Sequence, residues 1–276
     1  MVKEGSRIGE IFQLGQPIGT GGSAVVYAAT DLRSGKQVAI KIDQGKDPST
    51  RDRLRHEAFI LNQIRHQNVV ALIDWKDLPN QAVYLVMERL EGCTINQIIP
   101  QNIGLPFRSV WPILQQILDG ISAVHAKNIV HLDLKPSNIF LAVLEEHHTQ
   151  VKILDFSIAK MVGEKMDGHP VGTPGFVSPE HILGNCAADP RADIYALGAL
   201  LAFFLTGQRP YHGQKPEQIL AKQLAEAPET LDVSYLGQSK DLQGIVLKAM
   251  HRDPEERYKN VAAFKAALNS IRWSSG

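Results

Sequence analysis

The sequence predicts a fold of the α+β class, in which a smaller strand-rich lobe is followed by a larger helical lobe. Residues 10–90 alternate apolar and polar side chains at strand spacing around one helical stretch, and later residues repeat apolar side chains at helical spacing. The length of 276 residues suits one large domain or two lobes with a buried core. We therefore expect lobes at residues 8–90 and 91–273, with a ligand-binding cleft between them.

The smaller lobe is expected to begin with two strands joined by the glycine-rich stretch Gly19–Tyr27. Because this stretch lies between strands, we interpret it as a hairpin turn whose glycines let backbone amides approach a phosphate closely. Taken alone, an ordinary glycine hairpin is an equally good interpretation. The next strand, Gln37–Ile42, places Ala39 and Lys41 on one face, where a flat ligand could lie against the alanine beside the lysine.

One helix is expected in this lobe, at residues 50–66, where leucine and isoleucine repeat at helical spacing. Glu57 lies on the same apolar stripe. Burying a carboxylate is costly unless a cation meets it, and Lys41 is the candidate partner. A last strand is expected at Val83–Met87, followed by a connector at residues 88–92.

The larger lobe is expected to open with a long amphipathic helix at residues 110–124, with Pro112 tolerated in its first turn. Further helices are expected at residues 193–205, 216–224, 242–250 and 261–271. The first of these is apolar on all sides, which indicates a helix buried in the core of the lobe.

The composition argues against several classes of function. The 29 lysine and arginine residues balance 29 aspartate and glutamate residues, which disfavours binding to nucleic acid or a membrane surface through net charge. Cys93 and Cys186 form no disulfide or metal-ligand pattern, which favours a reducing, cytoplasmic location. The N-terminus lacks the apolar run of a signal peptide, and the most apolar stretch, Ile194–Leu205, is shorter than the ~20 residues needed to span a bilayer.

Four short motifs follow one another along the chain: GTGGSAVVY (Gly19–Tyr27), VAIK (Val38–Lys41), HLDLKPSN (His131–Asn138) and LDFS (Leu154–Ser157). Each alone is a weak signal, but their joint order and spacing are specific. Together they resemble the catalytic domain of eukaryotic-like serine/threonine protein kinases, over nearly the whole chain. The segment GTPGFVSPE (Gly172–Glu180) is similar to the corresponding segment of bacterial members. The resemblance implies a bilobal fold, with a small antiparallel sheet and one main helix in the first lobe.

The resemblance also implies an ATP site in the cleft. Lys41, held in place by Glu57, would bind the α- and β-phosphates. Asp133 would be the catalytic base, and Lys135 would stabilise charge on the transferring phosphoryl group. The metal ligands would be Asn138 and Asp155, whose oxygens suit Mg²⁺. The remaining nucleotide-binding residues would be Ile18, Gly19, Gly21, Gly22, Val26, Ala39, Met87, Glu88, Leu90 and Phe140.

Four further residues would support the protein-substrate platform and the larger lobe. Thr173 lies where serine/threonine kinases use a threonine to brace the catalytic base. Glu180 would pair with Arg257 in a buried, architectural ion pair. Asp193 would hold the backbone of the catalytic loop.

Two departures from the family pattern bear on mechanism. Leu132 replaces the arginine that commonly receives a phosphorylated residue of the activation segment, and residues 156–174 contain only Ser157 and Thr173 as hydroxyl side chains. We therefore expect an enzyme that does not depend on phosphorylation of this segment. Ser157 replaces the usual glycine, and it would either stiffen the motif or hinder metal binding.

The leading hypothesis is a serine/threonine protein kinase that uses ATP and Mg²⁺ and acts on protein substrates, with no nucleic-acid partner and no membrane-spanning segment. One alternative is a pseudokinase that binds nucleotide as a scaffold, which the joint presence of the catalytic residues disfavours. Another is a small-molecule kinase of related fold, which the motifs DIYALG (Asp193–Gly198) and RDPEERY (Arg252–Tyr258) disfavour.

Overall fold

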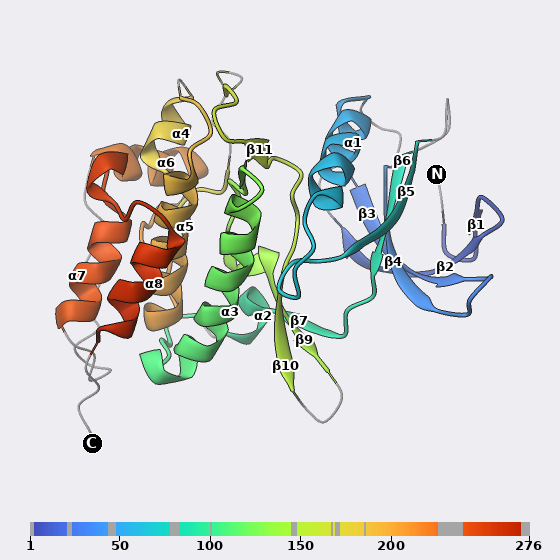
Figure 1. The fold of residues 1–276 in the computed structure, drawn as a ribbon, viewed down its shortest axis with the longest axis horizontal. Helices are drawn as coiled ribbons and strands as arrows, with labels where there is room; N and C mark the ends of the chain where they lie inside the picture. Colours follow the sequence, from blue (N-terminus) through green and yellow to red (C-terminus); the bar gives the residue numbers. More distant parts are fainter. Residues whose placement is uncertain are drawn as a thin grey trace.

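The computed structural model describes residues 3–20, 24–43, 48–77, 83–99, 101–144, 148–166, 168, 172–184, 186–225 and 240–271. These residues form a smaller lobe around a β-sheet and a larger, mainly helical lobe (Figure 1). The α+β class and the bilobal arrangement predicted from the sequence are confirmed.

The smaller lobe contains an antiparallel sheet with the strand order β1-β2-β3-β4-β6-β5. Its strands are β1 (Arg7–Ile8), β2 (Phe12–Thr20), β3 (Ala24–Asp31), β4 (Gln37–Asp43), β5 (Leu72–Asp77) and β6 (Val83–Glu88). The predicted alternation on β4 is present, because Val38, Ile40 and Ile42 pack in one apolar cluster, whereas Ala39 and Lys41 face a cavity between the lobes.

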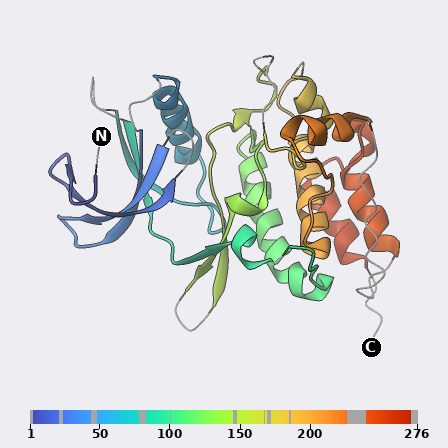
Figure 2. The ribbon, with the colours of Figure 1, turned by 180° about the vertical axis from the view of Figure 1, so that it is seen from behind.

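Helix α1 (Pro48–Asn62) packs against β4, β5 and β6 on one side of this sheet (Figures 1 and 2). Its inward side buries Leu54, Ala58 and Leu61 together with Glu57. The helix ends at Asn62, before the predicted residue 66. The apolar period continues past its end because Ile64, which follows the helix, is also buried.

The larger lobe is built around helix α5 (Pro190–Thr206), whose residues are almost all buried. The helix starts earlier than predicted, since the Asp189 side chain caps it by accepting a hydrogen bond from the Arg191 amide (2.8 Å) and Pro190 occupies its first turn. The other helices are α2 (Ile95–Ile98), α3 (Phe107–His125), α4 (Pro179–Leu183), α6 (Pro216–Ala225), α7 (Lys240–Ala249) and α8 (Val261–Asn269).

Pro112 corrects one expectation. Helix α3 begins at Phe107, so Pro112 lies inside the helix, beyond the first turn where it was expected. The start was missed because Arg108 and Ser109 are polar, although the Phe107 side chain before them is buried in the core.

The two aspartate motifs lie between short strands of the larger lobe. Strands β7 (Gly92–Thr94), β9 (Ile139–Val143) and β10 (Thr149–Ile153) form one sheet, and β8 (Ile129–Val130) pairs with β11 (Lys160–Met161). HLDLKPSN thus runs from β8 to β9, and LDFS runs from β10 to β11. The Leu154 amide donates a hydrogen bond to the Asn138 carbonyl (2.8 Å), so the two motifs lie side by side at the cleft.

Candidate active site

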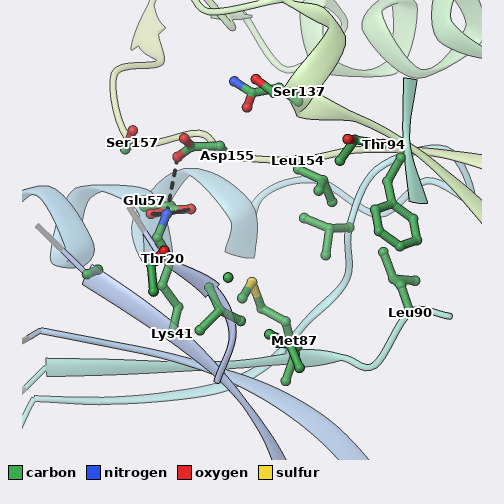
Figure 3. A pocket seen from close by; sticks show the side chains of 18 of the residues that line it. Thr20, Lys41, Glu57, Met87, Leu90, Thr94, Ser137, Leu154, Asp155 and Ser157 are labelled. Carbon is green, nitrogen blue, oxygen red and sulfur yellow. Dashed lines mark hydrogen bonds and ion pairs between the residues drawn. The ribbon is translucent and has the colours of Figure 1, made fainter. Parts of the chain in front are cut away.

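A cavity of about 1260 Å³ lies between the lobes and collects side chains from both (Figure 3). Its lining includes nearly all the predicted nucleotide-binding residues: Ile18, Gly19, Val26, Ala39, Lys41, Met87, Glu88, Leu90 and Phe140. Gly21 and Gly22 lie outside the described residues. Leu154 and Thr94 also line the cavity and were not predicted, although Leu154 had a signal in that it directly precedes Asp155.

Lys41 joins the two lobes. Its ammonium group donates hydrogen bonds to both carboxylate oxygens of Glu57 (2.8 and 2.7 Å). It also donates to Oδ1 of Asp155 in the larger lobe (3.1 Å), the bond that is drawn as a dashed line in Figure 3. Burial lowers the pKa of Lys41, but the two neighbouring carboxylates outweigh this effect and raise it above its ordinary value. The lysine therefore stays charged, and the pair that the sequence predicted between Lys41 and Glu57 is formed.

Asp155 is held with its carboxylate toward the cavity. Its backbone takes a left-handed conformation (φ 60°), and the next residue, Phe156, is fully buried against the His131 ring, with ring centroids 4.6 Å apart. Burial raises the pKa of Asp155, but the Lys41 charge and the nearby Ser157 hydroxyl bring it down to about 2. The Asp155 carboxylate is therefore ionised at any ordinary pH.

Three side chains converge on the Asp133 carboxylate. The Thr173 hydroxyl donates to Oδ1 (2.7 Å), the Lys135 ammonium donates to Oδ2 (2.6 Å), and the Asn138 side-chain amide donates to Oδ2 (3.1 Å) and to the backbone carbonyl (2.8 Å). Lys135 also donates to the Thr173 hydroxyl (2.9 Å). The predicted brace between Thr173 and the loop is thus present in the geometry.

Asn138 and Asp155 fit the chemistry of a magnesium site. The Asn138 nitrogen points toward Asp133, which leaves its oxygen for another contact, and both residues line the cavity. An amide oxygen and a carboxylate are the hard ligands that Mg²⁺ accepts, together with water and phosphate. Among the described residues, no group of three or more His, Cys, Asp or Glu side chains could hold a metal. A metal here would therefore need further oxygens from a nucleotide or from water.

Asp193 anchors the start of the HLDLKPSN motif. This fully buried carboxylate accepts hydrogen bonds from the backbone amides of His131 and Leu132 (2.9 Å each) and lies 2.8 Å from Nε2 of His125. The anchor holds Leu132 in a left-handed conformation (φ 66°) that a residue with a Cβ rarely adopts. His125 was not predicted, since nothing near it in the sequence links it to Asp193.

Arg257 and Glu180 form the predicted ion pair in a two-bond arrangement, at 2.8 and 2.7 Å. The Arg257 side chain is completely buried, donates further hydrogen bonds to backbone carbonyls, and stacks over the Tyr195 ring at 5.0 Å. Although burial raises the pKa of Glu180, its hydrogen bonds from Arg257 hold the pKa well below its ordinary value.

Glu88, predicted as a backbone contact for the ligand, also has a structural role. Its carboxylate accepts hydrogen bonds from the buried Lys152 ammonium (2.7 and 2.9 Å) and from the Ala71 amide (2.8 Å). The connector between the lobes is thereby fastened to β10, just before LDFS.

Comparison with known proteins agrees with this geometry. The sequence model of the protein kinase domain matches residues 12–269. The chain is 37% identical over 265 residues to the serine/threonine-protein kinase Pkn1 of Myxococcus xanthus, with 93% of this chain and 38% of the relative covered. It is 32% identical over 275 residues to the serine/threonine-protein kinase PknB of Mycobacterium leprae, with 96% of this chain and 43% of the relative covered.

A probable serine/threonine-protein kinase of Streptomyces coelicolor is 33% identical over 280 residues, with 98% of this chain and 41% of the relative covered. The chain thus spans about two fifths of the length of the curated relatives that it matches. None of the helices in the described part of the chain has both the length and the apolar character needed to cross a lipid bilayer.

Proposed function

The chain belongs to the protein kinase family, and from that premise we propose that it transfers the γ-phosphoryl group of ATP to serine and threonine hydroxyls of protein substrates. The contact between Lys41 and Asp155, at 3.1 Å across the cleft, is the observation that carries this proposal. It joins the residue assigned to the α- and β-phosphates with a residue assigned to the metal, so both would meet one bound triphosphate. The formed pair with Glu57 favours a working enzyme over a scaffold that only binds nucleotide.

Asp133 would accept the proton of the substrate hydroxyl. A general base of this kind typically contributes ~10²–10⁴-fold to the rate. The bonds from Lys135, Thr173 and Asn138 fix the direction of its carboxylate, which keeps an unshared electron pair aimed at one position. The Lys135 ammonium group would stabilise negative charge on the transferring phosphoryl group. It would become available for this contact when a substrate displaces its hydrogen bond to Asp133.

The adenine would lie in the apolar part of the cavity. Val26 and Ala39 lie on the side of the smaller lobe, and Phe140 and Leu154 on the side of the larger lobe, so a flat ring fits between them. Met87 would close the back of this space. Mg²⁺ held by Asn138 and Asp155 would neutralise phosphate charge.

An assay with labelled ATP and a generic basic protein tests the proposed activity. We expect phosphate transfer by the wild type, and little or none after Asp133→Ala or Lys41→Met. Transfer that persists in Asp133→Ala would contradict the base assignment. Nucleotide binding without transfer in the wild type would favour the scaffold, and phosphoamino-acid analysis of the product would test the preference for serine and threonine.

We further propose that this kinase works without phosphorylation of its activation segment. Leu132, in the place of the usual arginine, is 8% exposed and packs in an apolar cluster with Met166 of the activation segment and with Val130, Ala188 and Ala192. An apolar side chain in this cluster offers nothing to a phosphate, and its burial supplies the contact that a phosphate and an arginine would otherwise make.

Backbone hydrogen bonds support the same conclusion. The activation segment pairs with β8 through β11 and then with residues 186–188, where the Gly163 amide donates to the Ala188 carbonyl (2.9 Å) and the Met166 amide donates to the Cys186 carbonyl (3.1 Å). These backbone bonds, together with the Lys160–Glu164 ion pair (2.7 Å), fix the path along residues 160–166 without a phosphate.

Phosphatase treatment tests the independence from phosphorylation. We expect enzyme that carries no phosphate on residues 156–174, as verified by mass spectrometry, to keep its full activity. Negligible activity that returns on phosphorylation of this segment would refute the proposal. Leu132→Ala is expected to lower activity by loosening the apolar cluster, whether or not the segment carries phosphate.

A further inference from the structure

Gln223 on helix α6 is a buried polar side chain that no motif singles out. It is 1% exposed, and its amide group contacts the backbone of residues 175–177. Its Oε1 accepts a hydrogen bond from the Gly175 amide (2.8 Å), and its Nε2 donates to the Val177 carbonyl (2.9 Å). One side chain thus bonds to the backbone on both sides of Phe176, as a neighbouring strand would.

The segment held in this way also carries Thr173. The amides of Phe176 and Val177 both donate to the Thr173 carbonyl (2.9 Å each), and the Thr173 hydroxyl donates to Asp133. A continuous series of hydrogen bonds therefore leads from Gln223 to the catalytic base. Phe176 itself is buried, with its ring edge-on to Phe203 at 6.4 Å, so the segment is fastened by its side chain as well as by its backbone.

We propose that Gln223 is a positioning residue for the protein substrate, which fixes residues 172–178 in the shape that receives the chain around the phosphoacceptor. This inference rests on the proposed kinase function and goes beyond it, since it assigns to helix α6 a part in substrate binding. Gln223 does not line the nucleotide cavity. Its loss should therefore weaken binding of the protein substrate and leave the affinity for ATP unchanged.

The side-chain amide is needed because the two backbone partners have opposite requirements. The Gly175 amide requires an acceptor and the Val177 carbonyl requires a donor, and a glutamine supplies both. Gln223→Glu keeps the acceptor and loses the donor, whereas Gln223→Met keeps the shape and loses both.

Gln218 on the same helix provides a matched control. It is exposed, and its Oε1 accepts hydrogen bonds from the Gln214 and Lys215 amides (2.9 and 3.3 Å). Since these bonds use only its oxygen, Gln218→Glu should preserve them. The same chemical change on one helix is therefore expected to be harmless at residue 218 and damaging at residue 223.

The test measures KM for a generic basic protein, the affinity for Mg²⁺–ATP, and amide hydrogen exchange of residues 172–178. In Gln223→Glu and Gln223→Met we expect KM for the protein to rise on the order of tenfold, because a buried backbone carbonyl loses its partner. ATP affinity should stay at the wild-type value. Exchange at Gly175 should accelerate in Gln223→Met and remain slow in Gln223→Glu, and Gln218→Glu should match the wild type throughout.

Three results would overturn the proposal: an unchanged KM for the protein, a parallel loss of ATP affinity, or equal effects at residues 218 and 223. If Gln223→Met fails to fold, Gln223→Glu decides alone. If the wild type phosphorylates no protein, the proposed function fails by itself. Hydrogen exchange then still decides whether Gln223 holds the segment, and unaltered exchange in Gln223→Met would reject it.

Discussion

Ser157 lies two residues after Asp155, at the point where most kinases have glycine, and its hydroxyl helps to lower the pKa of the Asp155 carboxylate. The residue of this motif with a left-handed backbone is Asp155, not Ser157. A side chain at residue 157 therefore does not strain the backbone, and the serine hydroxyl favours the ionised form of the carboxylate that would bind the metal.

Removal of this hydroxyl should weaken the use of magnesium. In Ser157→Ala we expect the Mg²⁺ concentration for half-maximal activity to rise by about 10-fold, the size typical of a lost partner of a metal ligand. A magnesium titration at saturating ATP measures this, with Ser137→Ala, another serine of the cavity wall, as the control. Half-saturation that does not change, or that falls, would show that the serine is neutral or hinders the metal.

Among the secondary-structure elements, α1 contacts the activation segment through the side chain of His56. Nε2 of His56 lies 2.5 Å from the Ala159 carbonyl oxygen, so this ring nitrogen must donate. His56 directly precedes Glu57, and the bond therefore helps to hold α1 where Glu57 meets Lys41.

His56→Ala should release α1 from the activation segment. We expect kcat to fall by about 3- to 10-fold, because one net hydrogen bond contributes ~1 kcal/mol to the position of the helix. His56→Gln retains an N–H donor and should recover part of the loss. Steady-state kinetics on both variants check this, and equal loss in the two would mean that the ring is needed for packing and not for its hydrogen bond.

Helix α4 is held to the end of the larger lobe by the Glu180–Arg257 pair. The pKa of Glu180 is lowered in the folded state, so its stabilising contribution is complete above the ordinary value of 4.5 and is lost as the pH falls below it. We expect Glu180→Gln to lower the free energy of unfolding by about 1–3 kcal/mol near pH 7, with a smaller difference from the wild type near pH 3.

Denaturant unfolding at several pH values measures this difference. Glu255→Gln is the matched control, since Glu255 is 75% exposed and its ion pair with Arg191 at 2.7 Å should contribute little. A difference between wild type and Glu180→Gln that grows on acidification would contradict the expected sign.

At the scale of the whole molecule, the sequence predicted the lobes and the convergence of Lys41, Glu57 and Asp155, because the motifs carry charged groups that only make chemical sense together. It could not predict the contacts of His56 and Gln223. Both partners of each contact are backbone groups or single polar residues far apart in the chain, with no local signal. The C-terminal end of α1 and the N-terminal end of α3 were missed for a related reason. Tertiary packing buries apolar residues outside a helix and leaves polar residues inside it, so the spacing of apolar residues does not mark the helix ends.

Binding of nucleotide between the lobes should stabilise the whole molecule. A ligand that binds only the folded state at 100 times its Kd adds about 2.7 kcal/mol, which should raise the melting temperature by several degrees. Since Lys41 lines the cavity and bonds to Asp155 across it, Lys41→Met should remove most of this shift. Lys36→Met, at an exposed position before β4, should retain it.

Chelation of Mg²⁺ should reduce the shift in the wild type, because Asn138 and Asp155 would reach the phosphates only through the metal. Melting curves with and without ATP check each variant, and an equal shift in Lys41→Met and the wild type would place the nucleotide elsewhere.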